Sequence, residues 1–105
     1  MNVISPKQLK ARLDAEEPLI VIDVREDWEV RLSHLPFAIT IPMGEIPGAL
    51  PRIPKDKPVV IMCHHGNRSA QVVLWLARQG FDNVINMTGG IEQWTRDVDR
   101  SIPRY

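Results

Sequence analysis

Two short, nearly uninterrupted apolar runs limit the folds that this chain can adopt. Residues 19–24 read Leu-Ile-Val-Ile-Asp-Val, and residues 59–62 read Val-Val-Ile-Met. Because neither run alternates regularly between apolar and polar residues, each predicts a strand that is covered on both faces, as in parallel sheets. Two further short strands are predicted at residues 38–41 and 84–86. The chain should therefore contain a buried, mostly parallel sheet.

Helical segments are predicted between these strands. Ser5 followed by Pro6 is typical of a helix start, and Gly80 is placed to end the most apolar helix. The proline-rich residues 43–54 should form only short helical turns. The predicted helices cover residues 5–17, 25–32 and 70–79 and a segment that begins at Ile91. This alternation indicates an α/β domain with helices on both faces of the sheet.

The length of the chain limits the number of domains that it can contain, and its charge limits the kinds of partner that it can bind. With 105 residues it has the size of one domain, so we expect a single domain over residues 1–105 with a tail at about 99–105. Its 13 basic and 13 acidic residues give a formal net charge of zero. That balance argues against a nucleic acid or an anionic membrane as a partner.

The cellular location is predicted from three features. The first six residues contain neither a basic segment nor an apolar one. No apolar stretch approaches the ~20 residues that span a bilayer. Cys63 is the only cysteine, so no internal disulfide can form, as is usual in a reducing compartment. We therefore expect a cytoplasmic protein.

Cys63 is placed where parallel sheets bind their ligands. It follows the strand at 59–62 and precedes a helix that starts near Arg68, and ligands lie beyond the carboxyl ends of such strands. The intervening turn can direct backbone N–H groups at the sulfur, with Gly66 allowing a tight curl. This environment favours the thiolate, which is the nucleophilic form. The alternative is an inert cysteine packed at the end of a core strand.

The residues around Cys63 resemble the active-site loop of rhodanese domains, whose pattern is Cys-x-x-Gly-x-Arg-Ser. The loop residues here are Cys63, His64, His65, Gly66, Asn67, Arg68 and Ser69. Further segments similar to that family follow its order along the chain: Asp23-Val24-Arg25, His34-Leu35-Pro36 with Ala38 and Ile41-Pro42, Gly80-Phe81, and Gly89-Gly90-Ile91 with Trp94. Two glycines usual in the family are replaced by Ser33 and Phe37, which affects the turn around His34.

The resemblance implies a fold and a reaction. The fold would be a five-stranded, mostly parallel sheet. Cys63 would take the outer sulfur of thiosulfate, or of another sulfane-sulfur donor, and carry it as a persulfide that the amides of residues 64–69 surround. Cyanide or a thiol acceptor would then remove it. No cofactor is expected, and the chain offers no second thiol that could discharge Cys63.

Several side-chain roles remain open at this point. Arg68 could bind an anion directly, but we expect it to brace the loop by pairing with a carboxylate such as Asp23 or Glu45. Asp23 and Arg25 should support the loop, unless they form a plain surface ion pair.

The histidines and tryptophans have ordinary alternatives as well. His64 and His65 could orient substrate or help to hold the thiolate, although a purely backbone role is favoured. A zinc site that joins them to Cys63 is disfavoured, because adjacent side chains rarely converge on one tetrahedral ion. The three tryptophans are expected to be packing residues: Trp28, Trp75 and Trp94.

Two other functions use a similar loop. A persulfide carrier, or a docking module in a sulfur-delivery pathway with a protein acceptor, would have the same fold and the same cysteine. A cysteine phosphatase or arsenate reductase places five residues between its cysteine and arginine, whereas four separate Cys63 from Arg68 here. The shorter loop favours binding of a single sulfur atom.

Overall fold

The fold is built on one five-stranded parallel sheet, seen in a computed structural model that describes all 105 residues. The strands are β1 (Val3–Ile4), β2 (Ile20–Asp23), β3 (Ala38–Thr40), β4 (Val59–Met62) and β5 (Val84–Met87). They lie in the order β1-β5-β4-β2-β3, and every neighbouring pair is parallel. The expected α/β architecture is confirmed, with a sheet that is wholly parallel.

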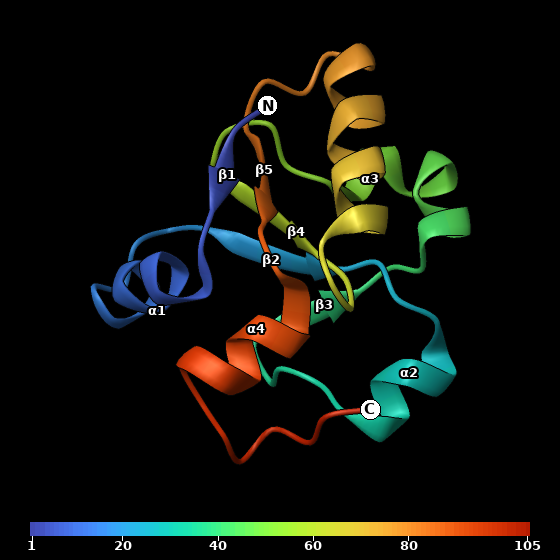
Figure 1. Ribbon diagram of the computed structural model, residues 1–105. Coiled ribbons are helices and arrows are strands. Elements are labelled where there is room, and N and C mark those ends of the chain that lie inside the picture. The colour runs from blue at the N-terminus through green and yellow to red at the C-terminus, as the bar shows by residue number, and fades with distance from the viewer.

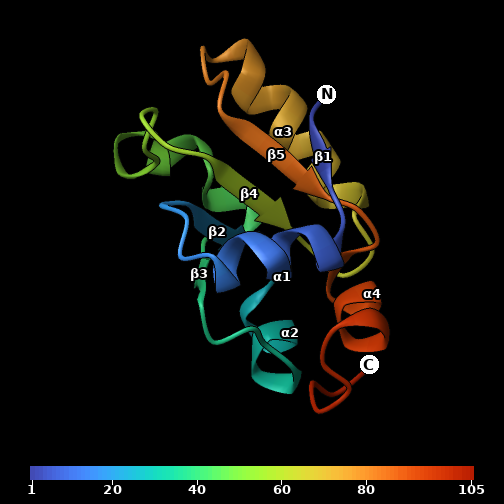
Figure 2. The same ribbon diagram turned by 90° about the vertical axis from the view of Figure 1, so that its left-hand side faces the viewer.

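Helices cover both faces of this sheet. They are α1 (Pro6–Asp14), α2 (Asp27–Leu32), α3 (Asn67–Arg78) and α4 (Gly90–Asp97), with two 3₁₀ segments, η1 (Met43–Glu45) and η2 (Pro47–Arg52). Figures 1 and 2 show α3 on one side of the sheet and α1 with α4 on the other. None of these helices combines the length and the apolar character required to cross a bilayer.

The alternation of side chains along β4 divides the core into two layers. Val59 and Ile61 pack in the cluster that contains residues of α3 and η2, whereas Val60 and Met62 pack in the cluster that contains residues of α1 and α4. Successive residues of a strand point to opposite faces. Cys63 continues the first series and joins its cluster, so the sulfur lies on the face that α3 covers.

One strand was missed by the sequence prediction, and one helix begins earlier than its apolar pattern indicates. The edge strand β1, which pairs with β5, was not predicted, because two residues are too few to show a period. α3 begins at Asn67, next to the start near Arg68 that the turn after Cys63 predicts. The apolar spacing starts only at residue 70, because the first turn of the helix is polar. The predicted start at Ser5 is confirmed, because its side chain accepts a 3.1 Å hydrogen bond from the Gln8 amide.

The three tryptophans were expected to be packing residues, and they are buried to different degrees. Trp94 is buried and Trp75 is half-buried against the α3 side of the core. Trp28 on α2 is 55% exposed and packs only edge-on against the ring of Tyr105, with ring centroids 6.4 Å apart. α2 is short and lies beyond the end of the sheet (Figure 1), so no layer of the core covers this face.

Candidate active site

The loop after β4 crosses the carboxyl edge of the sheet and enters α3 (Figure 1). Gly66 adopts a left-handed conformation with φ of 103° immediately before the helix, which glycine tolerates without a steric penalty. The start of α4 supports the loop from outside, because the Ile91 amide donates to the Cys63 carbonyl at 2.9 Å and the Glu92 amide donates to the His64 carbonyl at 3.2 Å.

The sulfur of Cys63 accepts hydrogen bonds from two backbone amides. The Gly66 N–H lies 3.1 Å from Sγ and the Ser69 N–H lies 3.4 Å from it. The Ser69 hydroxyl is a third neighbour at 3.3 Å, and Cys63 is only 1% exposed. The six amides of residues 64–69 were expected to surround the sulfur, and these two lie within hydrogen-bond distance of Sγ itself.

Asn86 of β5 connects the two halves of this loop, and the sequence analysis did not single it out. Its Oδ1 accepts a 2.6 Å hydrogen bond from the Ser69 hydroxyl, and its Nδ2 donates to the Gly66 carbonyl at 3.3 Å. A buried asparagine in an otherwise apolar strand was the available signal, because buried polar side chains need partners.

Asp23 and Arg25 form a buried pair at the end of β2. The Arg25 guanidinium donates to Asp23 Oδ1 at 3.0 Å and to Oδ2 at 2.8 Å, and the two side chains are 0% and 1% exposed. Arg25 also donates to the Ser33 carbonyl at 2.7 Å. This pair is therefore not the plain surface ion pair that the sequence left open. It anchors the segment at Ser33, one of the two positions that differ from the family pattern.

Arg68 forms the bracing ion pair that was expected, but its partner is Glu29 rather than Asp23 or Glu45. Nη1 lies 2.7 Å from Oε2 and Nη2 lies 2.8 Å from Oε1, so the contact is bidentate. Hydrogen bonds from Arg68 outweigh the effect of burial and lower the pKa of Glu29 to about 2. Glu29 was missed because three acidic residues lie at α2 and its N-cap, Glu26, Asp27 and Glu29, and only the folded chain shows that Glu29 is the buried one.

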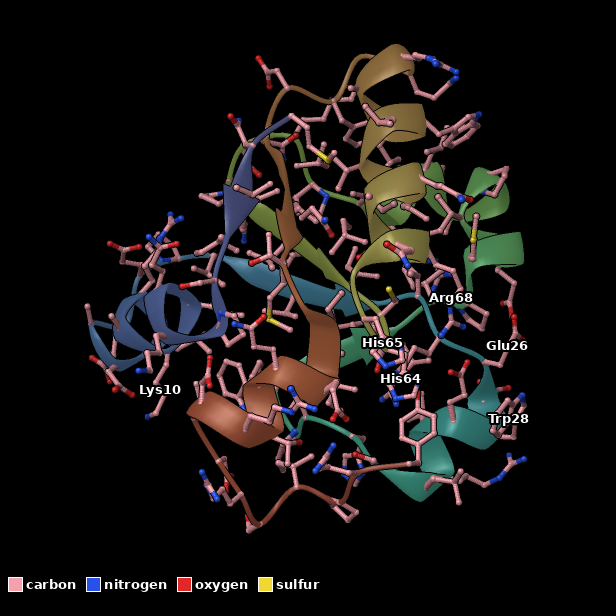
Figure 3. All side chains as sticks on the ribbon, in the orientation of Figure 1. Lys10, Glu26, Trp28, His64, His65 and Arg68 are labelled. Atoms are coloured by element: carbon pink, nitrogen blue, oxygen red, sulfur yellow. The ribbon has the colours of Figure 1, made fainter.

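The imidazole rings of the loop lie in one aromatic stack. His64 and His65 have ring centroids 3.9 Å apart, and the ring of Tyr105 lies on His64 at 3.9 Å with an angle of 5° between the planes. Figure 3 shows the two histidines side by side, near Arg68. Burial and then the charge of His65 lower the pKa of His64, which favours a neutral ring at neutral pH. Because the rings are stacked, the side chains of both histidines, and not only their backbones, have defined positions.

Tyr105 was assigned to a tail, yet its hydroxyl reaches two residues beside the loop. It accepts a hydrogen bond from Arg25 Nη1 at 2.9 Å and donates to Glu29 Oε1 at 2.8 Å. Nothing near Tyr105 in the sequence predicts this contact, because its partners are distant along the chain.

The protein contains no cluster of three or more Cys, His, Asp or Glu side chains arranged to bind a metal ion.

Comparisons with known proteins show the family of this chain. The Rhodanese-like domain family model matches residues 5–97. A sulfurtransferase of Allochromatium vinosum is 38% identical over 96 residues, which are 91% of this chain and 90% of that protein. A putative sulfur carrier protein of Bacillus subtilis is 35% identical over 92 residues, which are 88% of this chain and 50% of that protein.

The fold has a close counterpart among solved structures. The crystal structure of a rhodanese-like domain protein from Staphylococcus aureus superposes with a TM-score of 0.86 at 34% sequence identity, and the match covers 100% of this chain and 99% of that one. The loop, the parallel sheet around it and the match over residues 5–97 lead to the same assignment. This chain belongs to the rhodanese-like domain family.

Proposed function

We propose that this protein is a rhodanese-type sulfurtransferase in which Cys63 carries sulfane sulfur as a persulfide. The observation that supports this most directly is the pair of amides, from Gly66 and Ser69, that donate to Sγ at the start of α3. Backbone donors and a helix N-terminus stabilise negative charge on the atom that they face. The thiolate before transfer and the persulfide after it both carry that charge.

The loading step transfers one sulfur atom from thiosulfate. The Cys63 thiolate attacks the outer sulfur, a new S–S bond forms, and the S–S bond of thiosulfate breaks. Sulfite leaves with the electron pair of that bond, and Cys63 becomes a persulfide anion. We expect the backbone amides of residues 64–69 to donate to the outer sulfur atom once it carries the charge.

The unloading step returns Cys63 to its thiolate. The carbon of cyanide attacks the outer sulfur, a C–S bond forms, and thiocyanate leaves as the persulfide bond breaks. A thiolate acceptor would react in the same way and become a persulfide itself. Since Cys63 is the only cysteine, the acceptor comes from outside the chain, and a small thiol or a protein can fill this role. A free thiol with this role suits a reducing compartment such as the cytoplasm.

The partners of Arg68 argue against phosphate ester chemistry. Both terminal nitrogens of its guanidinium bind the carboxylate of Glu29. A phosphatase of the cysteine type needs the corresponding guanidinium for the oxygens of its substrate. Here that group is engaged in bracing the loop, which favours transfer of a single sulfur atom.

A persulfide carrier is the second candidate function. The relative from Bacillus subtilis that matches along 50% of its length is named a putative sulfur carrier protein, and carriage would use the same loading chemistry on Cys63. The rates separate the two functions. A carrier would accept sulfur from a protein persulfide much faster than from thiosulfate, whereas a thiosulfate sulfurtransferase would turn over with thiosulfate and cyanide alone.

Intact-protein mass spectrometry tests the proposal. After treatment with thiosulfate the protein should gain the mass of one sulfur atom, and addition of cyanide should remove it with formation of one thiocyanate per chain. Cys63→Ser should fold normally and gain nothing. If the wild-type mass stays unchanged with thiosulfate and with a small-molecule persulfide, Cys63 does not carry sulfur and the proposal is wrong.

A further inference from the structure

The segment after α4 returns to the candidate active site. Arg104 donates from Nε to Glu92 of α4 at 2.8 Å, and Tyr105 then reaches Glu29 of α2. Figure 1 shows this end of the chain beside α2, and Figure 2 shows it beside α4. Residues 98–105 therefore connect the two helices that lie on either side of the Cys63 loop.

Tyr105 contacts the loop and its supports through both its ring and its hydroxyl. The ring covers His64 in a parallel stack at 3.9 Å. The hydroxyl accepts the only side-chain hydrogen bond that Arg25 Nη1 donates, and it donates to the Glu29 carboxylate. Arg25 is fully buried, so loss of the hydroxyl would leave one of its donors without a partner, which is costly.

These contacts reach both ends of the loop that surrounds the sulfur. His64 directly follows Cys63, and Tyr105 stacks on it. Arg68 directly precedes Ser69, whose amide donates to Sγ, and Tyr105 reaches Arg68 through their shared partner Glu29. One side chain thus contacts His64 directly and reaches Arg68, at the other end of the loop, through Glu29.

We propose that Tyr105 is a positioning residue for sulfur transfer, which keeps the loop in the geometry that directs the Gly66 and Ser69 amides at Sγ. The inference rests on the proposed role of Cys63. Tyr105 touches no reacting atom and acts through His64 and Glu29. Its effect should therefore fall on the rate of sulfur loading more than on the binding of the donor.

Substitutions of Tyr105 separate the ring from its hydroxyl. Tyr105→Phe keeps the stack on His64 and should reduce the loading rate at saturating thiosulfate by roughly threefold, whereas Tyr105→Ala removes both contacts and should reduce it by roughly tenfold or more. The thiosulfate concentration that gives half-maximal rate should change by less than about twofold in both. Arg100→Ala is the matched control, since its exposed side chain lies in the same segment and makes no hydrogen bond or ion pair.

Arg104→Ala provides a second route if Tyr105→Ala does not fold. It removes the contact with Glu92 and loosens the segment without touching the loop, so it should slow loading to a smaller degree than Tyr105→Ala. Wild-type rates in Tyr105→Phe, Tyr105→Ala and Arg104→Ala would overturn the proposal. Faster loading in Tyr105→Ala would overturn it as well, because the side chain would then be a cover over the site.

Titration of the His64 imidazole by NMR gives a signal that does not depend on turnover. Burial lowers the pKa of His64, so exposing one ring face in Tyr105→Ala should raise that pKa, while Tyr105→Phe should leave it nearly unchanged. The other charged groups that act on this ring are present in every variant: His65, Glu29, Glu92 and Arg25.

The two measurements also distinguish this proposal from the proposed function. A wild-type protein that takes up no sulfur from thiosulfate or a persulfide would refute the role of Cys63, whatever the titration shows. Normal loading in the wild type with an unchanged His64 titration and unchanged rates in the variants would refute the role of Tyr105 alone.

Discussion

The Ser69 hydroxyl donates a 2.6 Å hydrogen bond to the side-chain oxygen of Asn86. Both residues are buried, and the same hydroxyl oxygen lies 3.3 Å from the sulfur of Cys63. The contact joins the first turn of α3 to β5, so the position of the helix N-terminus over the sulfur depends on a strand that is distant along the chain.

Asn86→Ala should therefore weaken both the fold and the loop. It removes the acceptor of Ser69 and the donor to the Gly66 carbonyl, and a buried group left without a partner costs about 1–3 kcal/mol. Urea unfolding should show a loss of that size, and sulfur loading of Cys63 should slow. Asn2→Ala, at an exposed asparagine, should change neither, and equal stability of the two variants would contradict the assigned role.

The ion pair between Glu29 and Arg68 should make stability depend on pH in the acid range. The pKa of Glu29 is lowered from 4.5 to about 2 in the folded protein. A carboxylate with a depressed pKa stabilises the fold fully above its unfolded value, and this stabilisation is lost as the pH falls through the folded value. The window therefore runs from about pH 4.5 down to about 2.

Glu29→Gln measures that contribution. At pH 6 its free energy of unfolding should be lower than that of the wild type by on the order of 2 to 3 kcal/mol. Denaturant titrations between pH 6 and pH 2.5 should show this difference shrinking steadily below about pH 4.5. Two curves that stay parallel over the whole range would mean that the pKa of Glu29 is not depressed by Arg68.

The sequence predicts the parts of this molecule whose signals are local. The apolar residues of β4, the glycine-containing turn and the following helix lie within one continuous segment, and together they place Cys63 at the edge of a sheet. Asp23, Arg25 and Arg68 were also predicted to support the loop, but Glu29 and Tyr105 have no such local signal. Glu29 is 39 residues from Arg68 and 76 from Tyr105. Glu29 also has two acidic neighbours, Glu26 and Asp27, and only the packing of α2 shows that Glu29 is the one that pairs with Arg68.

Asp23→Ala should be among the most destabilising single changes in the protein. It leaves the guanidinium of Arg25 buried without its carboxylate partner, and breaking a buried pair from one side costs about 3–5 kcal/mol. Asp14→Ala is the matched control, because it breaks the exposed pair with Lys10, which is worth less than about 1 kcal/mol. Similar losses in urea unfolding for the two variants would contradict the structural role of the buried pair.

Gly90 should accept no side chain without displacing the Cys63 loop. A Cβ atom at this position would lie 2.3 Å from the His64 carbonyl oxygen and 2.5 Å from that of Cys63, and the backbone has a φ of 61°. The obstacle is backbone rather than a flexible side chain, so the start of α4 and the loop would have to separate.

Gly90→Ala should consequently cost more than about 2 kcal/mol, because a left-handed alanine alone costs roughly 1 kcal/mol and the clash adds to it. Sulfur loading on Cys63 should fall in parallel, since the amides of α4 that fix the loop carbonyls would move. Gly48→Ala, where a Cβ meets nothing within 4 Å, should leave both properties unchanged. Normal sulfur loading in a stably folded Gly90→Ala would show that the loop geometry does not depend on its contact with α4.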